Sequence, residues 1–253
     1  MIELYGMGSP NVLKILIMLE EIGQPYRFHH VDVMRGQGQA PEFLRLNPIG
    51  KVPVITDDAS GTSLTIFESG AILIYLAETY GAHLLPSRGP ERWEVLKWLF
   101  AQAAYAGPML GQHNHFQFVA SQSDSYGGRR YKDQAGRVYR DFDDRLRQVP
   151  WLGGGAYSIA DIAMYPWAGY LKRHGFDEND HPHILKWRKR IDAREQVKRA
   201  VAAVGNMIAA VAAPAQAPTD KDYDLFFGRS APGPAPDHEH YMSLGSFTSI
   251  EPE

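Results

Sequence analysis

The sequence predicts two structural units: a small mixed α/β domain followed by an all-helical domain. Three observations support this fold class. Strand and helix patterns alternate through the first 80 residues, a Gly- and Pro-rich break follows at 81–90, and only helical patterns run from 91 to about 212. A chain of 253 residues is long enough for two such domains.

The first unit is predicted from alternating patterns and turn residues. Apolar residues at 2–5 indicate a strand, and those at 11–23 follow helical spacing up to Gly23. The remaining expected elements are a strand at 26–33, a short helix at 40–48, strands at 51–57 and 63–68, and a helix at 69–81. The order β-α-β-α-β-β-α predicts a mixed sheet with helices packed on it.

The second unit reads as a helical bundle. Ser158 and Asp161 stand at capping-box spacing before one of its helices, where we expect a structural role. The helical patterns cover residues 91–112, 126–148, 158–175, 183–194 and 197–213.

These patterns predict the domain boundaries. We expect the α/β domain at 1–81, a linker at 82–90, the helical domain at 91–212 and a tail at 213–253. The tail is rich in Pro and Ala, which is typical of disorder. If it is ordered, Phe226 and Phe227 are expected to anchor it on the body or on a partner subunit.

Composition excludes several classes of function. The net charge of −3 does not predict a nucleic-acid-binding surface, and no apolar run is long enough to cross a membrane. The N-terminus lacks the pattern of a signal peptide, so we expect a cytoplasmic protein. Because cysteine is absent, disulfides, cysteine nucleophiles and thiolate metal sites are excluded, and any thiol chemistry needs a thiol from a ligand.

Three short motifs carry the prediction of a functional site. The stretch "YGMGSPNVLK" (5–14) puts Ser-Pro-Asn where the first strand gives way to the first helix. The loop "NPIGKVPVI" (47–55) runs into a strand through a Val-Pro step, and "FESGAILIYLAE" (67–78) places Glu-Ser before a helix.

The first motif resembles the start of the first helix in the thioredoxin fold, with the redox cysteines replaced. Together with "SIADI" (158–162), residues 1 to about 205 resemble the glutathione transferase superfamily. The stretches "FLRLNPIGKVPVI", "GPMLGQHNHF" and "WLGGGAYSIADIAMYPW" look most like its nu class, of the bacterial glutathione-dependent disulfide-bond reductase type. This resemblance implies glutathione as co-substrate, no metal, and a homodimer.

The resemblance implies a role for each matching position in binding glutathione. Ser69 and the N-terminus of its helix suit the γ-glutamyl carboxylate, and Glu68 suits the ammonium group. Val52, before a cis Pro53, would present its backbone to the cysteinyl unit, and Lys51 would pair with the glycyl carboxylate. Gln39 matches a further contact, but shifted local spacing leaves Gln37 as an alternative.

The resemblance also implies that Ser9 and Asn11 stabilise the thiolate of glutathione at the start of the first helix. The thiolate is the nucleophile, and a hydrogen-bond donor and a helix dipole both favour it. A plainer interpretation is that Ser9 only caps the helix, for which serine is a favoured residue, and Pro10 only opens its first turn. The two roles of Ser9 are compatible.

Two further features have plain alternatives. "QHNHF" (112–116) suggests a metal, but histidines at i and i+2 point to different sides of a helix, so we expect the stretch to line the cleft between domains. Arg130 would ordinarily be a solvated helix residue, whereas the resemblance implies that it reaches glutathione in the neighbouring subunit.

The sequence thus predicts a glutathione-dependent disulfide reductase with transferase or peroxidase side activities. The alternative is a non-catalytic ligand-binding or regulatory protein of the same fold. A glutaredoxin-like enzyme with its own thiols is excluded because the chain has no cysteine. The intact set of site residues favours catalysis.

Overall fold

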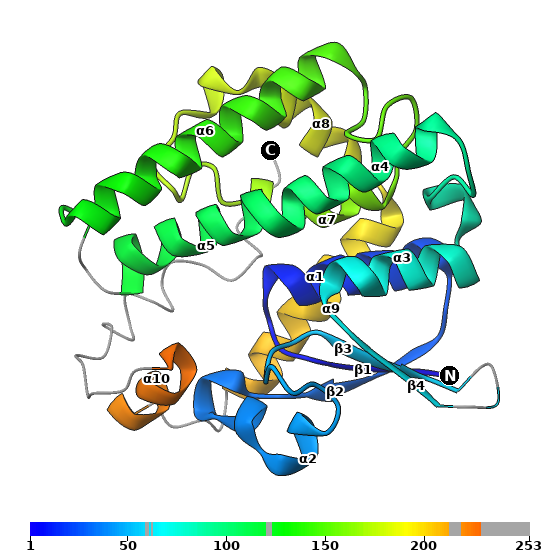
Figure 1. Ribbon diagram of the computed structural model, residues 1–253, viewed down its shortest axis with the longest axis vertical. Helices are drawn as coiled ribbons and strands as arrows, with labels where there is room; N and C mark the ends of the chain where they lie inside the picture. Colours follow the sequence, from blue (N-terminus) through cyan, green and yellow to red (C-terminus); the bar gives the residue numbers. More distant parts are fainter. Residues whose placement is uncertain (59–60, 62, 120–122, 213–218, 229–253) are drawn as a thin grey trace.

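The computed structural model describes residues 1–58, 61, 63–119, 123–212 and 219–228 (Figure 1). The greater part of the predicted tail, at 213–218 and 229–253, lies outside the described residues. Within the described part, a four-stranded sheet and three helices form the first unit, and the chain from Pro90 onward is helical. The predicted α/β plus all-α fold class is therefore confirmed.

The sheet has the strand order β2-β1-β3-β4. β1 pairs in parallel with β2 and antiparallel with β3, and β3 pairs antiparallel with β4. The strands are β1 (Ile2–Gly6), β2 (Tyr26–His30), β3 (Val54–Asp57) and β4 (Leu64–Phe67). Leu4 is paired with both Phe28 and Ile55, which puts the middle of β1 at the centre of the sheet.

Three strands are shorter than the sequence predicts, and the one expected at 63–68 spans only Leu64–Phe67. The strand expected at 26–33 ends at His30, because the chain turns into a 3-10 helix, η1 (Val33–Arg35), capped by Asp32. The strand expected from 51 begins only at Val54, since Pro53 has no N–H for a ladder hydrogen bond. The expected cis peptide bond between Val52 and Pro53 is present.

Three helices pack on the sheet: α1 (Pro10–Ile22), α2 (Pro41–Leu44) and α3 (Ser69–Thr79). Figure 1 shows α1 and α3 side by side on one face and α2 on the other. Ser9 caps the start of α1, and Gly23 ends it in the left-handed conformation with φ 64°.

The second unit consists of α4 (Pro90–Ala101), α5 (Gly107–Asn114), α6 (Tyr126–Gln148), α7 (Ile159–Ala168), α8 (Pro182–Asp192) and α9 (Glu195–Ala212). The long helix expected at 91–112 widens into a π-helical turn, η4 (Gln102–Ala106). Pro108 follows this turn and cannot donate to the carbonyl of residue 104, which explains a change of hydrogen-bond spacing here. The helix expected at 158–175 ends at Ala168, before Gly169.

Helix α1 joins the two units. It contacts α3 of the first unit and α7 and α9 of the second. The run from Val12 to Leu19 is consequently buried on all sides and belongs to the same apolar core as α4–α9. The start of α1 therefore lies where the α/β unit meets the helical unit.

The tail contributes one described helix, α10 (Asp220–Phe227), which packs against η1. Thr219 and Asp222 form a capping box at its start, and Gly228 ends it in the left-handed conformation. No helix among the described residues is long and apolar enough to cross a membrane.

Candidate functional site

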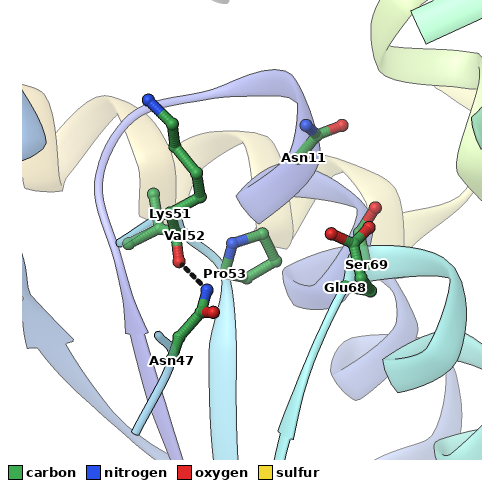
Figure 2. A pocket seen from close by; sticks show the side chains of 7 residues that line it. All are labelled: Asn11, Asn47, Lys51, Val52, Pro53, Glu68 and Ser69. Carbon is green, nitrogen blue, oxygen red and sulfur yellow. Dashed lines mark hydrogen bonds between the residues drawn. The ribbon is translucent and has the colours of Figure 1, made fainter. Parts of the chain in front are cut away.

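A pocket lies beside the starts of α1 and α3 and the loop before β3 (Figure 2). Its lining includes six of the nine residues predicted for the site. In full, the lining residues are Asn11, Asn47, Lys51, Val52, Pro53, Glu68 and Ser69. Figure 2 shows Lys51 and Val52 on one side of Pro53, Glu68 and Ser69 on the other, and Asn11 at the start of α1.

The start of α1 presents an amide to the pocket. Trp167 of α7 donates a hydrogen bond from Nε1 to Asn11 Oδ1 at 3.2 Å, so the oxygen of this amide is engaged and its NH2 group is the part left to donate. Ser9 does not line the pocket; its Oγ accepts from the backbone N–H of Val12 at 3.2 Å. Ser9 is thus a helix cap in this structure, with its own hydroxyl proton left to donate.

Asn47 shapes the loop that carries Lys51 and Val52. Its Nδ2 donates to the carbonyl of Lys51 at 2.7 Å, and its Oδ1 accepts from the N–H of Ile49 at 3.0 Å. Asn47 is not among the site residues predicted from the sequence, although its place in "NPIGKVPVI" was a signal. Val52 precedes the first ladder pair of β3, at Val54, so it lies outside the sheet pairing.

The start of α3 brings Glu68 and Ser69 together. Glu68 has a φ of 71°, the only positive φ of a non-glycine residue among those described, and such strain gathers at ligand sites. Glu68 is exposed, whereas Ser69 is buried at the first position of α3. The free N–H groups of the first turn and the positive end of the helix dipole favour an anion here.

Lys14 lies behind Ser69 and is not among the site residues predicted from the sequence. Its Nζ donates to Ser69 Oγ at 3.3 Å and to Gln102 Oε1 at 2.6 Å. The side chain is only 2% exposed, and this burial lowers the pKa of Lys14 to about 7, against the opposing effect of the Glu68 carboxylate. The available signal was a lone lysine inside the apolar run "VLKILIML".

The two candidate glutamines are placed differently. Gln37 accepts a hydrogen bond from the N–H of Asp32 at 2.7 Å and is engaged in its own loop. Gln39 lies against Gly50, because a Cβ atom added at Gly50 would come within 2.4 Å of Gln39 Nε2. Gln39 is thus next to the Lys51 loop, although it is not among the residues lining the pocket.

Arg130 and the histidines of "QHNHF" lie apart from the pocket lining. Arg130 is exposed on α6. His113 points into the helical core and bonds to the carbonyl of His174 at 3.2 Å, whereas the His115 ring contacts Phe227 at 5.0 Å. The two histidines therefore point in different directions, as their spacing predicts.

Helix α10 reaches both units near the pocket. The ring of Phe226 lies 5.5 Å from Lys51 Nζ, and the ring of Phe227 contacts His115 of the helical unit. Both phenylalanines are half-buried. The tail helix thus contacts one residue of the pocket lining.

The arrangement offers complementary groups to a small zwitterionic molecule. An anion site at the start of α3, a carboxylate at Glu68, a cation at Lys51 and an amide donor at Asn11 surround the cis-proline loop. Among the described residues, no group of three or more His, Asp or Glu side chains is suited to hold a metal ion.

Comparison with known proteins places the chain in a family. Residues 1–78 match the N-terminal domain and 129–195 the C-terminal domain of glutathione S-transferase. The disulfide-bond oxidoreductase YfcG of Escherichia coli is 43% identical over 204 residues, covering 79% of this chain and 94% of the relative.

Solved structures of the same family also resemble this chain. A glutathione transferase family member from Pseudomonas fluorescens with two glutathione bound has a TM-score of 0.73 at 36% identity, covering 79% of this chain and 91% of its own. A glutathione transferase from Pseudomonas putida with one glutathione disulfide per subunit has a TM-score of 0.74 at 34% identity, covering 79% and 90%. This chain belongs to the glutathione transferase superfamily.

Proposed function

We propose that this protein is a glutathione-dependent disulfide reductase. The observation that carries the proposal is the pocket that joins the starts of α1 and α3 to the cis-proline loop, in a chain with no cysteine. Such a site supplies binding groups but no thiol, so the reacting sulfur comes from the ligand. The name of the YfcG relative and the glutathione species bound in the solved relatives support the choice of chemistry.

Glutathione fits the charges of the pocket. Its γ-glutamyl carboxylate lies at Ser69 and the N-terminus of α3, and its ammonium group pairs with the Glu68 carboxylate. The cysteinyl unit bonds to the backbone of Val52 as an added strand would. Lys51, with Gln39 beside its loop, receives the glycyl carboxylate.

The sulfur of this ligand lies at the start of α1. A free thiol with a pKa near ~8.5 is mostly protonated at neutral pH, whereas the thiolate is the nucleophile. The NH2 group of Asn11, oriented by Trp167, donates to the thiolate and stabilises it. The positive end of α1 contributes in the same sense. Ser9 adds its hydroxyl proton if the sulfur approaches the cap.

The reaction proceeds by two thiol–disulfide exchanges. The thiolate of bound glutathione attacks one sulfur of the substrate disulfide, which forms a mixed disulfide and releases the other substrate sulfur as a thiolate. A second glutathione thiolate attacks the glutathione sulfur of the mixed disulfide, which gives glutathione disulfide and the second substrate thiol. Two glutathione molecules supply the two electrons, and no covalent enzyme intermediate forms. The same bound thiolate would also attack electrophilic carbon or a peroxide, which accounts for transferase and peroxidase side activities.

The test is turnover of 2-hydroxyethyl disulfide with glutathione, coupled to NADPH consumption by glutathione reductase. We expect a glutathione-dependent rate above the uncatalysed background, and a raised KM for glutathione in Ser69→Ala. Thr65→Ala, an exposed substitution on β4, is the matched control and should behave as the wild type. Glutathione binding without turnover of any disulfide would instead identify a non-catalytic binding protein, and absence of binding would overturn the proposal altogether.

We also propose a homodimer. Trp93 and Phe100 stand seven residues apart on α4, which puts them on one face, and they are 65% and 58% exposed. In such a dimer Arg130 would reach the glutathione of the partner subunit. Light scattering should report two chains, and Arg130→Ala should weaken glutathione binding without changing the fold. A monomer at all concentrations would refute both expectations.

A cytoplasmic location suits this chemistry, because the cytosol keeps the glutathione pool reduced. The absence of cysteine means that the protein itself needs no oxidising compartment to fold.

A further inference from the structure

The Lys14 side chain is a buried cation without a counter-charge in contact. Lys14 is only 2% exposed, and its two hydrogen-bond acceptors, Ser69 Oγ and Gln102 Oε1, are both neutral. A buried ammonium is costly unless it is paired, so a lysine at this position lowers stability. Methionine or leucine would fill the same space without that penalty, which indicates that the amine serves the pocket.

Ser69 connects Lys14 to the pocket. Its Oγ accepts a hydrogen bond from Lys14 Nζ at 3.3 Å, so the hydroxyl proton of Ser69 is directed elsewhere. Ser69 lines the pocket at the first position of α3, where the free N–H groups of the helix also favour an anion. The hydroxyl proton is therefore available to donate to a bound carboxylate.

Gln102 fixes Lys14 from the opposite side. It opens the π-helical turn of the helical unit, and its Oε1 accepts from Lys14 Nζ at 2.6 Å. Its Nε2 is buried and has no hydrogen-bond partner among the residues that the structure describes. The hydrogen bond to Lys14 thus crosses the interface between the two units and engages only the oxygen of the Gln102 amide.

We propose that Lys14 is a positioning residue for the α-carboxylate of the ligand. The Lys14 amine orients the Ser69 hydroxyl toward the pocket. When it is protonated, it also supplies buried positive charge behind the start of α3. This inference rests on the proposed glutathione site, which it deepens. A ligand carboxylate at Ser69 would supply the nearby negative charge that Lys14 lacks among its direct contacts. Ligand binding and protonation of Lys14 therefore favour each other.

The charged groups around Lys14 permit this coupling between ligand binding and protonation. Glu68 is the carboxylate that acts on it, and it favours the ammonium, while burial favours the neutral amine and lowers the pKa of Lys14 to about 7. Other ionisable groups of α1 and of the elements near it have hydrogen-bond partners of their own. These pairs are Glu20 with Arg199, Glu21 with Arg194, Asp161 with Trp187, Tyr165 with Asp192, Tyr105 with Asp141, and Tyr75 and Tyr80 with Asp57.

The test measures proton uptake on binding of S-methylglutathione, whose sulfur cannot ionise. Calorimetric titrations at about pH 7.5 in buffers with different ionisation enthalpies give the number of protons taken up. For the wild type we expect roughly half a proton per site, and a dissociation constant that rises with pH above about 7. Zero uptake with a dissociation constant independent of pH would overturn the inference while leaving the glutathione site intact.

Two variants separate charge from packing. Lys14→Met should fold, take up no proton and bind S-methylglutathione about tenfold more weakly. Gln102→Glu replaces the unpartnered NH2 group with an oxygen and holds Lys14 as an ammonium before the ligand arrives, so proton uptake should vanish while binding persists. If Lys14→Met binds as the wild type does, or if Gln102→Glu retains full proton uptake, Lys14 is not coupled to the carboxylate. If the wild type binds neither glutathione nor S-methylglutathione at millimolar concentration, the proposed function fails and this inference with it.

Discussion

The amide of Asn11 offers the sharpest test of the proposed chemistry. Trp167 Nε1 donates to its Oδ1 at 3.2 Å, which leaves the NH2 group to donate to the glutathione thiolate. A hydrogen bond to a charged acceptor contributes about 1.5–3 kcal/mol, and one pKa unit corresponds to about 1.36 kcal/mol. Asn11→Ala should therefore raise the pKa of the bound thiol by about one to two units.

The effect on rate follows from the thiolate fraction and its reactivity. At neutral pH the thiolate fraction would fall about tenfold to a hundredfold. A more basic thiolate is also a better nucleophile, with a Brønsted coefficient of about 0.4–0.5. The two effects partly offset each other, so we expect a net loss of about threefold to tenfold at pH 7. Above the raised pKa the loss should disappear or reverse, and the two pH profiles should cross.

The assay combines the ultraviolet absorbance of the bound thiolate, titrated against pH, with the pH profile of disulfide reduction. Trp167→Phe is the matched variant, because it removes the donor that orients Asn11 while keeping an aromatic ring, and it should shift the thiol pKa in the same direction by less. Ser9→Ala should cost about 1 kcal/mol of stability through the lost cap and shift the thiol pKa only if its hydroxyl contacts the sulfur. An unchanged thiol pKa in Asn11→Ala, or an equal loss of rate at every pH, would refute the reasoning.

Three other predictions concern stability and the tail. Burial lowers the pKa of Lys14 from 10.5 to about 7, so between these pH values the unfolded chain binds more protons than the folded one. The free energy of unfolding of the wild type therefore rises with pH over this range. In urea unfolding, Lys14→Met should be the more stable protein at about pH 7 and should lose that advantage by about pH 10. Equal stability of the two proteins at pH 7 would contradict this. Asp161→Ala removes the acceptor of four buried donors and should lower the free energy of unfolding by at least about 3 kcal/mol. A loss below about 1 kcal/mol would show that water replaces the carboxylate. Replacing Phe226 and Phe227 together by Ala should change the relative rates with small and large disulfides more than it changes the KM for glutathione. Unchanged rates across a series of disulfide substrates would show that α10 plays no part in the cleft.

Local signals in the sequence determined most of the fold. The apolar periodicity of 11–23, the capping serine and Gly23 define α1 closely, because each acts within a turn or two of the helix. The errors lie at ends of elements where a nearby residue competes: Asp32 caps a turn after β2, and Pro53 delays the start of β3. The predicted Glu68-Ser69 step and the Lys51–Pro53 loop do meet at one pocket, because the start of β3 pairs with the end of β4, where Val54 is opposite Phe67.

Only the tertiary structure decided which side chains support that pocket. The hydrogen bonds from Lys14 to Ser69 and Gln102 span 55 and 88 residues, and that from Trp167 to Asn11 spans 156. No spacing in the sequence encodes such pairs, because they depend on how α7 and the π-helical turn pack against α1. In the sequence, Lys14 is a single polar residue in an apolar helix, and Asn47 is a residue of a loop. In the folded protein, burial leaves the Lys14 amine with two neutral acceptors, one of which faces the pocket, and this contact connects the core to the site.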